Sequence, residues 1–317
     1  MSASAPLPRT DAYVELALLD GGSFIAESRK IHAGVENTTF RMYNWAFYIR
    51  NRGRHVLWDL GLDDGHSCYT PWVSEHILRE INHVGPRKSL TMQLHERGVA
   101  PEDIDTVLFS HAHFDHARPI SPTFPNATAF FGAGTKAYCA PGHLSSPASQ
   151  WDGRFFDPNL ATEKCEEILS SAGDEGRWIP FGPFDKALDY FGDGSFWIIQ
   201  APGHMPGNLC AAARLEGGQW VLLGSDCCHS RELLDGTQQI GWFDVPGAGS
   251  MSLHSDVDAA MDTIERIRVL ERIHGVHVAL AHDASWMMEG KDEVLMGLLS
   301  EEMKKTVGEK IEKGEVV

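Results

Sequence analysis

The sequence lacks both a long apolar segment and a recognisable leader. No apolar run in its 317 residues approaches the roughly 18–20 residues that a membrane-spanning helix needs. The first residues, MSASAPLPR, do not show the basic start and apolar stretch of a secretory signal. We therefore expect a cytoplasmic protein that does not bind membranes.

Basic residues and paired cysteines are also scarce. The chain has 27 Lys and Arg residues against 44 Asp and Glu residues, which gives a formal net charge of −17. A chain this acidic is poorly suited to bind the phosphate backbone of nucleic acids or an anionic membrane surface. The six cysteines are widely spread and form no CxxC pair, as expected for free thiols in a reducing compartment.

No repeat, low-complexity tract or flexible linker divides the chain. Its 43% hydrophobic and 22% charged residues are typical of a globular protein. We expect one domain over residues 1–317, with loop insertions at about 62–90 and 140–190. Within the second insertion we expect loops and one short helix at about 161–171.

Strand and helix patterns are interleaved along the chain. Apolar runs and turn residues predict strands at 13–19, 43–50, 54–60, 106–110, 196–200, 210–214, 219–225 and 276–280. Helical spacing of apolar residues predicts helices at 88–98, at 255–274 and from about 291. This alternation favours a layered α/β fold.

Histidine, in contrast, is abundant, with sixteen residues. Four ligand-type side chains lie within six residues, directly after the strand expected at 106–110: His111, His113, Asp115 and His116. Side chains two apart in extended backbone project to the same side. Neutral imidazole and carboxylate groups bind zinc and similar divalent cations, so this segment predicts a metal site.

Three further residues of ligand type follow other predicted strands. His204 comes after the strand at 196–200, Asp226 after the strand at 219–225, and His282 after the strand at 276–280. Rigid strands that deliver ligands to one rim provide the preorganisation that a metal site needs.

These motifs resemble those of the metallo-β-lactamase superfamily. The HxHxDH motif is intact at 111–116, the later His, Asp and His follow in the expected order, and Asp59 matches the early Asp-x-Gly motif. The resemblance covers roughly residues 13–285. It implies an α/β fold with a four-layer αβ/βα sandwich, and it is clearest to the branch that opens N-acyl-homoserine lactones.

The resemblance also implies two divalent metal ions, with zinc as the first candidate and manganese, iron or cobalt as alternatives. The implied ligands are His111, His113 and His204 for the first ion, Asp115, His116 and His282 for the second, and Asp226 as the bridge. A hydroxide shared by both ions would attack the carbonyl carbon of a small cyclic ester or cyclic amide. Asp115 would pass a proton to the leaving group.

One position departs from the lactonase pattern. Many lactonases carry a tyrosine three residues after the bridging aspartate, where this chain has His229. His229 is a candidate catalytic residue that would donate a hydrogen bond to the substrate; the alternative is a surface or supporting residue. We expect Asp59 to brace the metal loop and Asp283 to accept a hydrogen bond from His282. The other histidines, His254 among them, are interpreted as background.

Several functions remain open at this stage. The leading one is a lactonase or lactamase, with a benzoxazolinone-type γ-lactam hydrolase close behind. A thioester hydrolase like glyoxalase II ranks lower because the C-terminal third is acidic. A mono-iron persulfide dioxygenase, a nuclease and a non-catalytic binding protein rank lower still. A small-molecule substrate is the one predicted partner, and the oligomeric state is left open, with a homodimer as one option.

Overall fold

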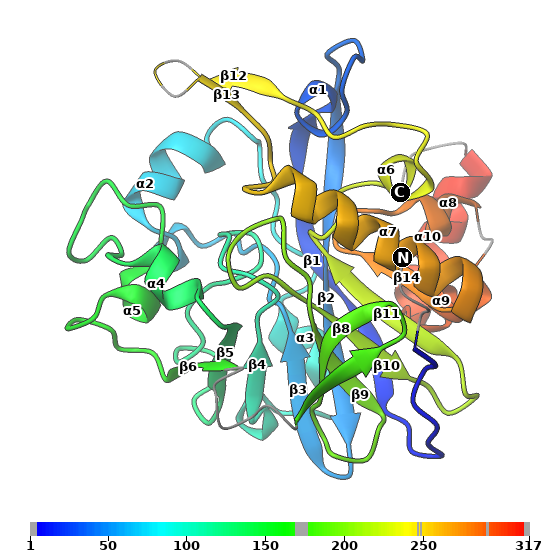
Figure 1. Ribbon diagram of the computed structural model, residues 1–317. Helices are drawn as coiled ribbons and strands as arrows, with labels where there is room; N and C mark the ends of the chain where they lie inside the picture. The colour runs from blue at the N-terminus through cyan, green and yellow to red at the C-terminus, as the bar shows by residue number, and fades with distance from the viewer. Residues whose placement is uncertain (1–4, 169–176, 246, 248, 290–291, 314–317) are drawn as a thin grey trace.

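The computed structural model describes residues 5–168, 177–245, 247, 249–289 and 292–313 (Figure 1). The strands are β1 Glu15–Glu27, β2 Thr39–Asn51, β3 Arg54–Trp58, β4 Thr106–Leu108, β5 Thr128–Gly132, β6 Cys165–Ile168, β7 Trp178–Phe181, β8 Phe184–Asp189, β9 Phe196–Gln200, β10 Leu209–Arg214, β11 Trp220–Ser225, β12 Phe243–Val245, β13 Gly249–Met251 and β14 His277–Leu280. The helices are α1 Ser28–Ile31, α2 Pro71–Val73, α3 Leu90–His95, α4 Thr135–Cys139, α5 Gly153–Phe156, α6 Arg231–Asp235, α7 Val257–His274, α8 Ser285–Glu289, α9 Glu293–Gly297 and α10 Glu301–Lys313, with short 3-10 or π segments η1 His66–Cys68, η2 Ser74–Leu78 and η3 Pro101–Asp103.

Most of these strands form two six-stranded sheets. The first has the order β1-β2-β3-β4-β5-β6 and is antiparallel up to β3 and parallel from there on. The second has the order β14-β11-β10-β9-β8-β7, in which only β11 and β14 pair in parallel. Parallel neighbours end at the same edge of a sheet, so the loops after β3 and β4 adjoin, as do the loops after β11 and β14.

Three apolar clusters separate the layers of the molecule. The first lies between the sheets, where Trp58 of β3 and Leu223 of β11 belong to one buried cluster. The second covers the outer face of the first sheet and includes Leu94 of α3. The third covers the outer face of the second sheet and includes Ile267 of α7. Alternate side chains of each strand point to opposite faces, so both faces of each sheet are covered, as in the predicted αβ/βα sandwich (Figure 1).

The first strand is longer than predicted. The strand expected at 13–19 continues through two glycines to Glu27, with a register shift in its pairing to β2. A Cβ atom on Gly21 would lie 2.7 Å from the backbone oxygen of Asn44, so the glycine permits a close backbone approach. It forms a bulge and not a turn, and the strand goes on to carry Phe24 towards the cleft described below.

The short helix predicted at 161–171 is wrong. Cys165–Ile168 forms β6, which pairs in parallel with β5, and residues 169–171 lie outside the described part. This pairing overrides the local helical preference of a glutamate-containing segment. The short helix of this region is α5, Gly153–Phe156, and strands β7 and β8 form a hairpin where only loops were expected.

The predicted C-terminal helix is interrupted. α9 ends at Gly297 and α10 begins at Glu301, and the hydroxyl of Ser300 accepts a hydrogen bond from the backbone N–H of Met303 at 3.2 Å. This side-chain cap explains why a new helix begins there. In the part of the chain that the structure describes, every helix is too short or too polar to span a membrane.

Candidate metal centre

Seven side chains predicted from the sequence come together where the two sheets meet. The segment after β4 provides His111, His113, Asp115 and His116; the loops after β9, β11 and β14 provide His204, Asp226 and His282. A hydrogen bond from the backbone N–H of Leu209 to the carbonyl oxygen of Ser110, 2.9 Å long, joins the first segment to the second sheet. Each ligand-type residue lies in the segment that follows the carboxyl end of a strand, as the sequence predicted.

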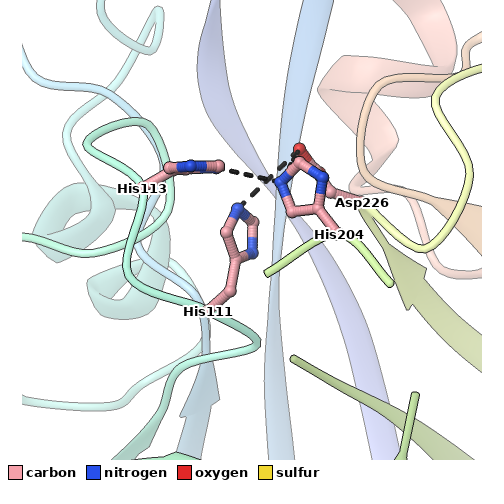
Figure 2. A group of neighbouring side chains, drawn as sticks. All are labelled: His111, His113, His204 and Asp226. Atoms are coloured by element: carbon pink, nitrogen blue, oxygen red, sulfur yellow. Dashed lines mark hydrogen bonds and ion pairs between the residues drawn. The ribbon is translucent and has the colours of Figure 1, made fainter. Parts of the chain in front are cut away.

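The first group consists of His111, His113, His204 and Asp226 (Figure 2). Its potential ligand atoms all lie within 4.8 Å of one another. His204 Nε2 is 2.9 Å from His113 Nδ1 and 3.5 Å from Asp226 Oδ2, and His111 Nε2 is 3.8 Å from the same carboxylate oxygen. Four donors thus converge on one small volume.

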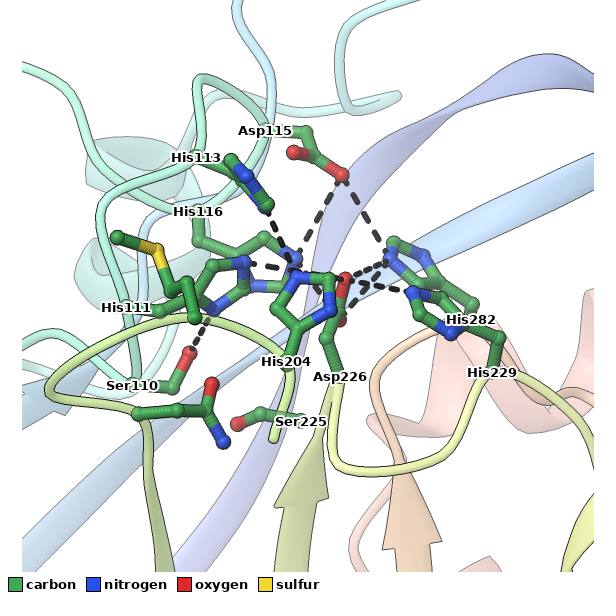
Figure 3. A network of polar contacts seen from close by, with 12 residues as sticks. Ser110, His111, His113, Asp115, His116, His204, Ser225, Asp226, His229 and His282 are labelled. Atoms are coloured by element: carbon green, nitrogen blue, oxygen red, sulfur yellow. Dashed lines mark hydrogen bonds and ion pairs between the residues drawn. The ribbon is translucent and has the colours of Figure 1, made fainter. Parts of the chain in front are cut away.

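The second group consists of Asp115, His116 and His282, whose ligand atoms also lie within 4.8 Å of one another. Asp226 Oδ1 is 3.1 Å from the Nε2 atoms of both His116 and His282. The two oxygens of Asp226 therefore face different groups, although Oδ2 also lies 3.3 Å from His282 Nε2. In Figure 3 dashed lines join the Asp226 carboxylate to His116 and His282, which belong to the second group.

The polar atoms of these groups are better placed to coordinate cations than to form hydrogen bonds with one another. His111 Nε2, His116 Nε2 and Asp226 Oδ1 are buried and have no hydrogen-bond partner among the described residues, although His116 Nε2 and Asp226 Oδ1 are close. Two ligands at about 2.0–2.2 Å from a tetrahedral zinc lie roughly 3.3–3.6 Å apart. The observed separations, from 2.9 to 3.8 Å, lie on both sides of this range. An unpaired buried polar atom is costly without such a partner.

Electrostatics keep most of the donors in the form that binds cations. Burial lowers the pKa of His111 and His204 well below the ordinary value, so both imidazoles are neutral. Burial alone would raise the pKa of Asp226, but His282 and His116 hold it well below its usual range. Burial opposes charge on His116, yet the carboxylates of Asp226, Asp115 and Asp59 raise its pKa well above the ordinary value, so a cation must displace its proton.

Outer hydrogen bonds orient several of the histidines. His116 Nδ1 lies 3.0 Å from Asp59 Oδ2, and Asp59 also accepts hydrogen bonds from Ser110, as expected for a residue that braces the loop. His282 Nδ1 lies 2.7 Å from the backbone oxygen of Tyr43. The expectation that Asp283 would orient His282 is therefore wrong; its Oδ1 accepts from the backbone N–H of Ser285 instead.

Two more histidines lie at this centre. His229 is buried, with Nε2 3.3 Å from Asp226 Oδ2, so it is not the surface residue of the alternative interpretation. His254, which the sequence does not distinguish from the background histidines, is 4% exposed and lies against His204 and His229, with ring centroids 5.4 and 4.8 Å away. Burial lowers the pKa of His254 to about 3, so it is neutral. Neither a motif nor strand spacing marked this residue.

A cleft of about 620 Å³ opens onto the centre. Its polar end contains residues of both groups and His229. Its other lining residues are largely apolar and include Phe24, Ile25, Ala26, Ile31, Met42, Ile77, Ile81, Phe114, Phe243 and Leu253. The aromatic residues of this lining are Phe24, Phe114 and Phe243, whereas Phe155 and Phe156 pack with Phe131 in the core.

Comparisons with known proteins agree with this geometry. The family model described as "Metallo-beta-lactamase superfamily" matches residues 40–118. The chain is 30% identical over 278 residues to the "Metallo-hydrolase mfmC" of Annulohypoxylon moriforme, a match that covers 76% of this chain and 70% of the relative. It is 36% identical over 146 residues to the "Gamma-lactamase MBL2" of Gibberella moniliformis, covering 43% of this chain and 54% of the relative.

Two further matches extend over most of the chain. The "Cytochrome P450 monooxygenase mpaDE" of Penicillium brevicompactum is 28% identical over 96% of this chain, which spans only 37% of that protein. A solved N-acyl homoserine lactone hydrolase, with the product N-hexanoyl-L-homoserine at its catalytic metal center, has a TM-score of 0.63 at 14% identity. That match covers 89% of this chain and 98% of the other, and it shows that the two share a fold.

Proposed function

The chain belongs to the metallo-β-lactamase superfamily of metal-dependent hydrolases, and on that premise we propose that it opens a small cyclic ester or cyclic amide at a pair of divalent cations. The observation that carries the proposal is the position of Asp226, whose two carboxylate oxygens face two separate groups of donors. Similarity to a γ-lactamase and a shared fold with a lactone hydrolase support both ring classes, so a γ-lactam is the second candidate substrate.

The donor set supports two cation positions. His111, His113 and His204 would hold the first cation, Asp115, His116 and His282 the second, and Asp226 both. Imidazole and carboxylate ligands make zinc the first candidate. When bound, such a pair lowers the pKa of water and polarises a carbonyl group.

His229 and Asp115 are the proposed catalytic residues beside the cations. Both line the cleft. His229 would donate a hydrogen bond to the substrate carbonyl oxygen, where negative charge develops during attack. Asp115 would hold the proton that the leaving oxygen or nitrogen takes. Its carboxylate is kept in place by Asn44, whose Nδ2 donates to Asp115 Oδ2 at 3.3 Å and to its backbone oxygen at 2.7 Å.

The cleft favours a neutral substrate over an anionic thioester. Lys30 is the only lysine or arginine among the described lining residues, and its Nζ is already paired with Glu27 at 2.6 Å. A glutathione-like anion would need free cationic partners, so the thioester hydrolase remains the weaker alternative. The six free cysteines support the further proposal of a reducing, cytoplasmic location.

A hydrolysis panel tests the proposed function. The zinc-loaded protein is assayed with lactones, lactams and thioesters that carry apolar substituents, and bound zinc is measured on the same sample. We expect ring opening of a lactone or a lactam, and a loss of more than about 100-fold in rate for Asp226→Asn. Asp185→Asn, at a side chain that is 75% exposed, serves as the control. Zinc-loaded protein that turns over neither ring class, or thioesters only, contradicts the proposal.

A further inference from the structure

The metal-site histidines differ in whether the ring nitrogen that faces away from the cation position has a hydrogen-bond partner. A metal-bound imidazole almost always donates its second N–H to an acceptor, which fixes the ring orientation and the tautomer. Such neighbours are present for His111, His116 and His282: their Nδ1 atoms lie 2.9 Å from Ser110 Oγ, 3.0 Å from Asp59 Oδ2 and 2.7 Å from the oxygen of Tyr43.

Among the histidines whose Nε2 faces a cation position, His204 is the one whose Nδ1 has no hydrogen-bond partner in the described part of the chain. Its Nε2 faces the first group, 2.9 Å from His113 Nδ1. Its Nδ1 is buried and has no hydrogen-bond partner among the residues that the structure describes. With a cation at Nε2 the proton must reside on Nδ1, so this atom needs an acceptor.

The neighbour with spare hydrogen-bonding capacity is His254. Both of its ring nitrogens are buried and unpartnered within the described residues, and the residue is 4% exposed. Its ring lies edge-on to that of His204, with centroids 5.4 Å apart and planes at 81°. A neutral imidazole offers one donor and one acceptor. One hydrogen bond between the two rings would therefore satisfy an orphaned atom on each.

Backbone contacts hold the two loops together. The N–H of Ser255 donates to the carbonyl oxygen of His204, and the N–H of Asp256 donates to that of Gly203, both at 2.9 Å. Gly203 has φ +131, and a Cβ there would lie 2.3 Å from the backbone nitrogen of Ala260 at the start of α7. This close approach is open only to glycine. Together with the two hydrogen bonds it holds residues 255–260, which directly follow His254, against the loop that carries His204.

We propose that His254 is a positioning residue that accepts a hydrogen bond from Nδ1 of His204 and so orients that imidazole toward the first cation. The proposal rests on the metal-dependent function proposed above, since it concerns a ligand of that centre. His254 does not line the cleft and acts only through His204.

A separate cation site is the competing interpretation. Ligand atoms of His204, His229 and His254 also lie within 4.8 Å of one another. However, His204 Nε2 already faces the first group, and His229 Nε2 faces Asp226 at 3.3 Å. Two of the three donors are thus directed to the shared centre, which favours the positioning role.

Zinc affinity, measured by competition with a chromophoric chelator, tests the proposal on the full-length protein. The variants are His254→Phe, which removes both nitrogens, His254→Gln, which retains an acceptor, His204→Ala, and the double variant His204→Ala/His254→Phe. We expect His254→Phe to weaken zinc binding by about 10–100-fold and His254→Gln to restore most of it. In the His204→Ala background His254→Phe should have no further effect, because coupled residues are not additive.

Controls separate this result from a general loss of structure. His277→Phe removes another histidine, one that pairs with Asp292 at 2.8 Å at the far end of β14 from His282, and should leave zinc affinity unchanged. Thermal unfolding of each cation-free variant checks the fold. If His254 acts through His204, the variants His204→Ala and His204→Ala/His254→Phe should bind zinc equally well. If His254 only supported the fold, His254→Phe would weaken zinc binding in the His204→Ala background too.

Four results would overturn the inference: wild-type zinc affinity in His254→Phe, additive losses in the double variant, no restoration by His254→Gln, or loss of an extra zinc equivalent with the remaining affinities unchanged. The last of these would establish the separate cation site. A wild-type protein that binds no zinc would instead defeat the proposed function, and this outcome is distinct from zinc binding that is insensitive to His254.

Discussion

The carboxylate of Asp59 accepts hydrogen bonds from both the backbone N–H and the hydroxyl group of Ser110. Oδ1 accepts the backbone N–H at 2.7 Å, and Oδ2 accepts the hydroxyl at 2.8 Å. Oδ2 also lies 3.0 Å from His116 Nδ1. Asp59 has φ +57, a left-handed conformation that costs energy in a residue with a Cβ. One strained and fully buried residue thus fixes the start and the end of the histidine-rich segment.

Asp59→Asn should damage stability and cation binding together. The amide can accept at only one of the two positions and has no charge for His116. We expect a loss of about 2–3 kcal/mol in the free energy of unfolding and of about 10–100-fold in zinc affinity, measured by urea unfolding and chelator competition. The exposed Asp185→Asn is the control, and an Asp59→Asn protein with unchanged zinc affinity would show that the brace is dispensable.

Asp226 and Asp115 should differ in how many cation positions they affect. Asp226→Asn should weaken binding at both positions, since its oxygens face both groups. Asp115→Asn should weaken only the second, because its carboxylate lies 3.5 Å from His116 Nε2 and 3.6 Å from His282 Nε2. Stepwise zinc titration followed by elemental analysis separates the two patterns. Identical titrations for the two variants would argue against a shared carboxylate.

Gly203→Ala tests the close packing under His204. The methyl group would meet Ala260 backbone at 2.3 Å in a conformation with φ +131, so both overpacking and backbone strain oppose it. We expect a loss of about 3 kcal/mol in the free energy of unfolding together with weaker zinc binding. Gly98→Ala, which has a positive φ but meets no atom within 4 Å, isolates the backbone contribution. Equal losses in both variants would contradict the packing argument.

The apolar residues that line the cleft should limit the size of the substituent that a substrate can carry. Ala26 lines the cleft near the end of β1, is partly exposed and packs at the margin of the third apolar cluster. Ala26→Trp would narrow the cleft, and thermal unfolding checks that the core is retained. We expect KM to rise about 10–100-fold for substrates with a large apolar substituent and to change little for an unsubstituted ring. Ala26→Ser is the matched control. A KM increase that is independent of substituent size would place substrates elsewhere.

The Arg54–Asp105 pair predicts a pH dependence of stability. Burial alone would raise the pKa of Asp105, but hydrogen bonds from Arg54, Thr106 and the backbone of His55 lower it below the ordinary value. The stabilisation is therefore complete above the unfolded-state value of about 3.9 and is lost as the pH falls through the lower folded-state value. The difference in unfolding free energy between wild type and Asp105→Asn should be constant from pH 7 to 5 and should shrink below about pH 4. Urea unfolding at each pH measures it, and a difference that persists at pH 2 would contradict this assignment.

The sequence was informative where local patterns carry the structure. Short apolar runs predicted the strands that precede His111, His204, Asp226 and His282. β11 and β14 pair in parallel, and β9 runs in the same direction because β9 and β11 both pair antiparallel with β10, so their carboxyl ends lie at one edge of the second sheet. The same reasoning failed at Cys165–Ile168, where pairing with β5 and not the local composition decides the structure.

Other features depend on contacts between distant loops. His254 has no motif, and its position follows from two backbone hydrogen bonds and a close approach at Gly203. The sequence did not predict Phe24 as a cleft residue, because the first strand was predicted to end at residue 19, before Phe24. Asp283 adjoins His282 in sequence, yet backbone geometry gives the hydrogen bond to Tyr43. Such relations require the tertiary structure.

The division of the donors between the two sheets determines when a cation can be acquired. The segment with His111 leaves the ribosome well before β9, β11 and β14 are made. At about 5–20 residues per second, roughly 10–30 s pass before His282 follows. During that interval the nascent chain holds part of a donor set without the carboxylate of Asp226. A cation held by donors of both sheets would therefore bind only after β14 has paired with β11, and the ions present at the end of folding would decide which metal the protein first receives.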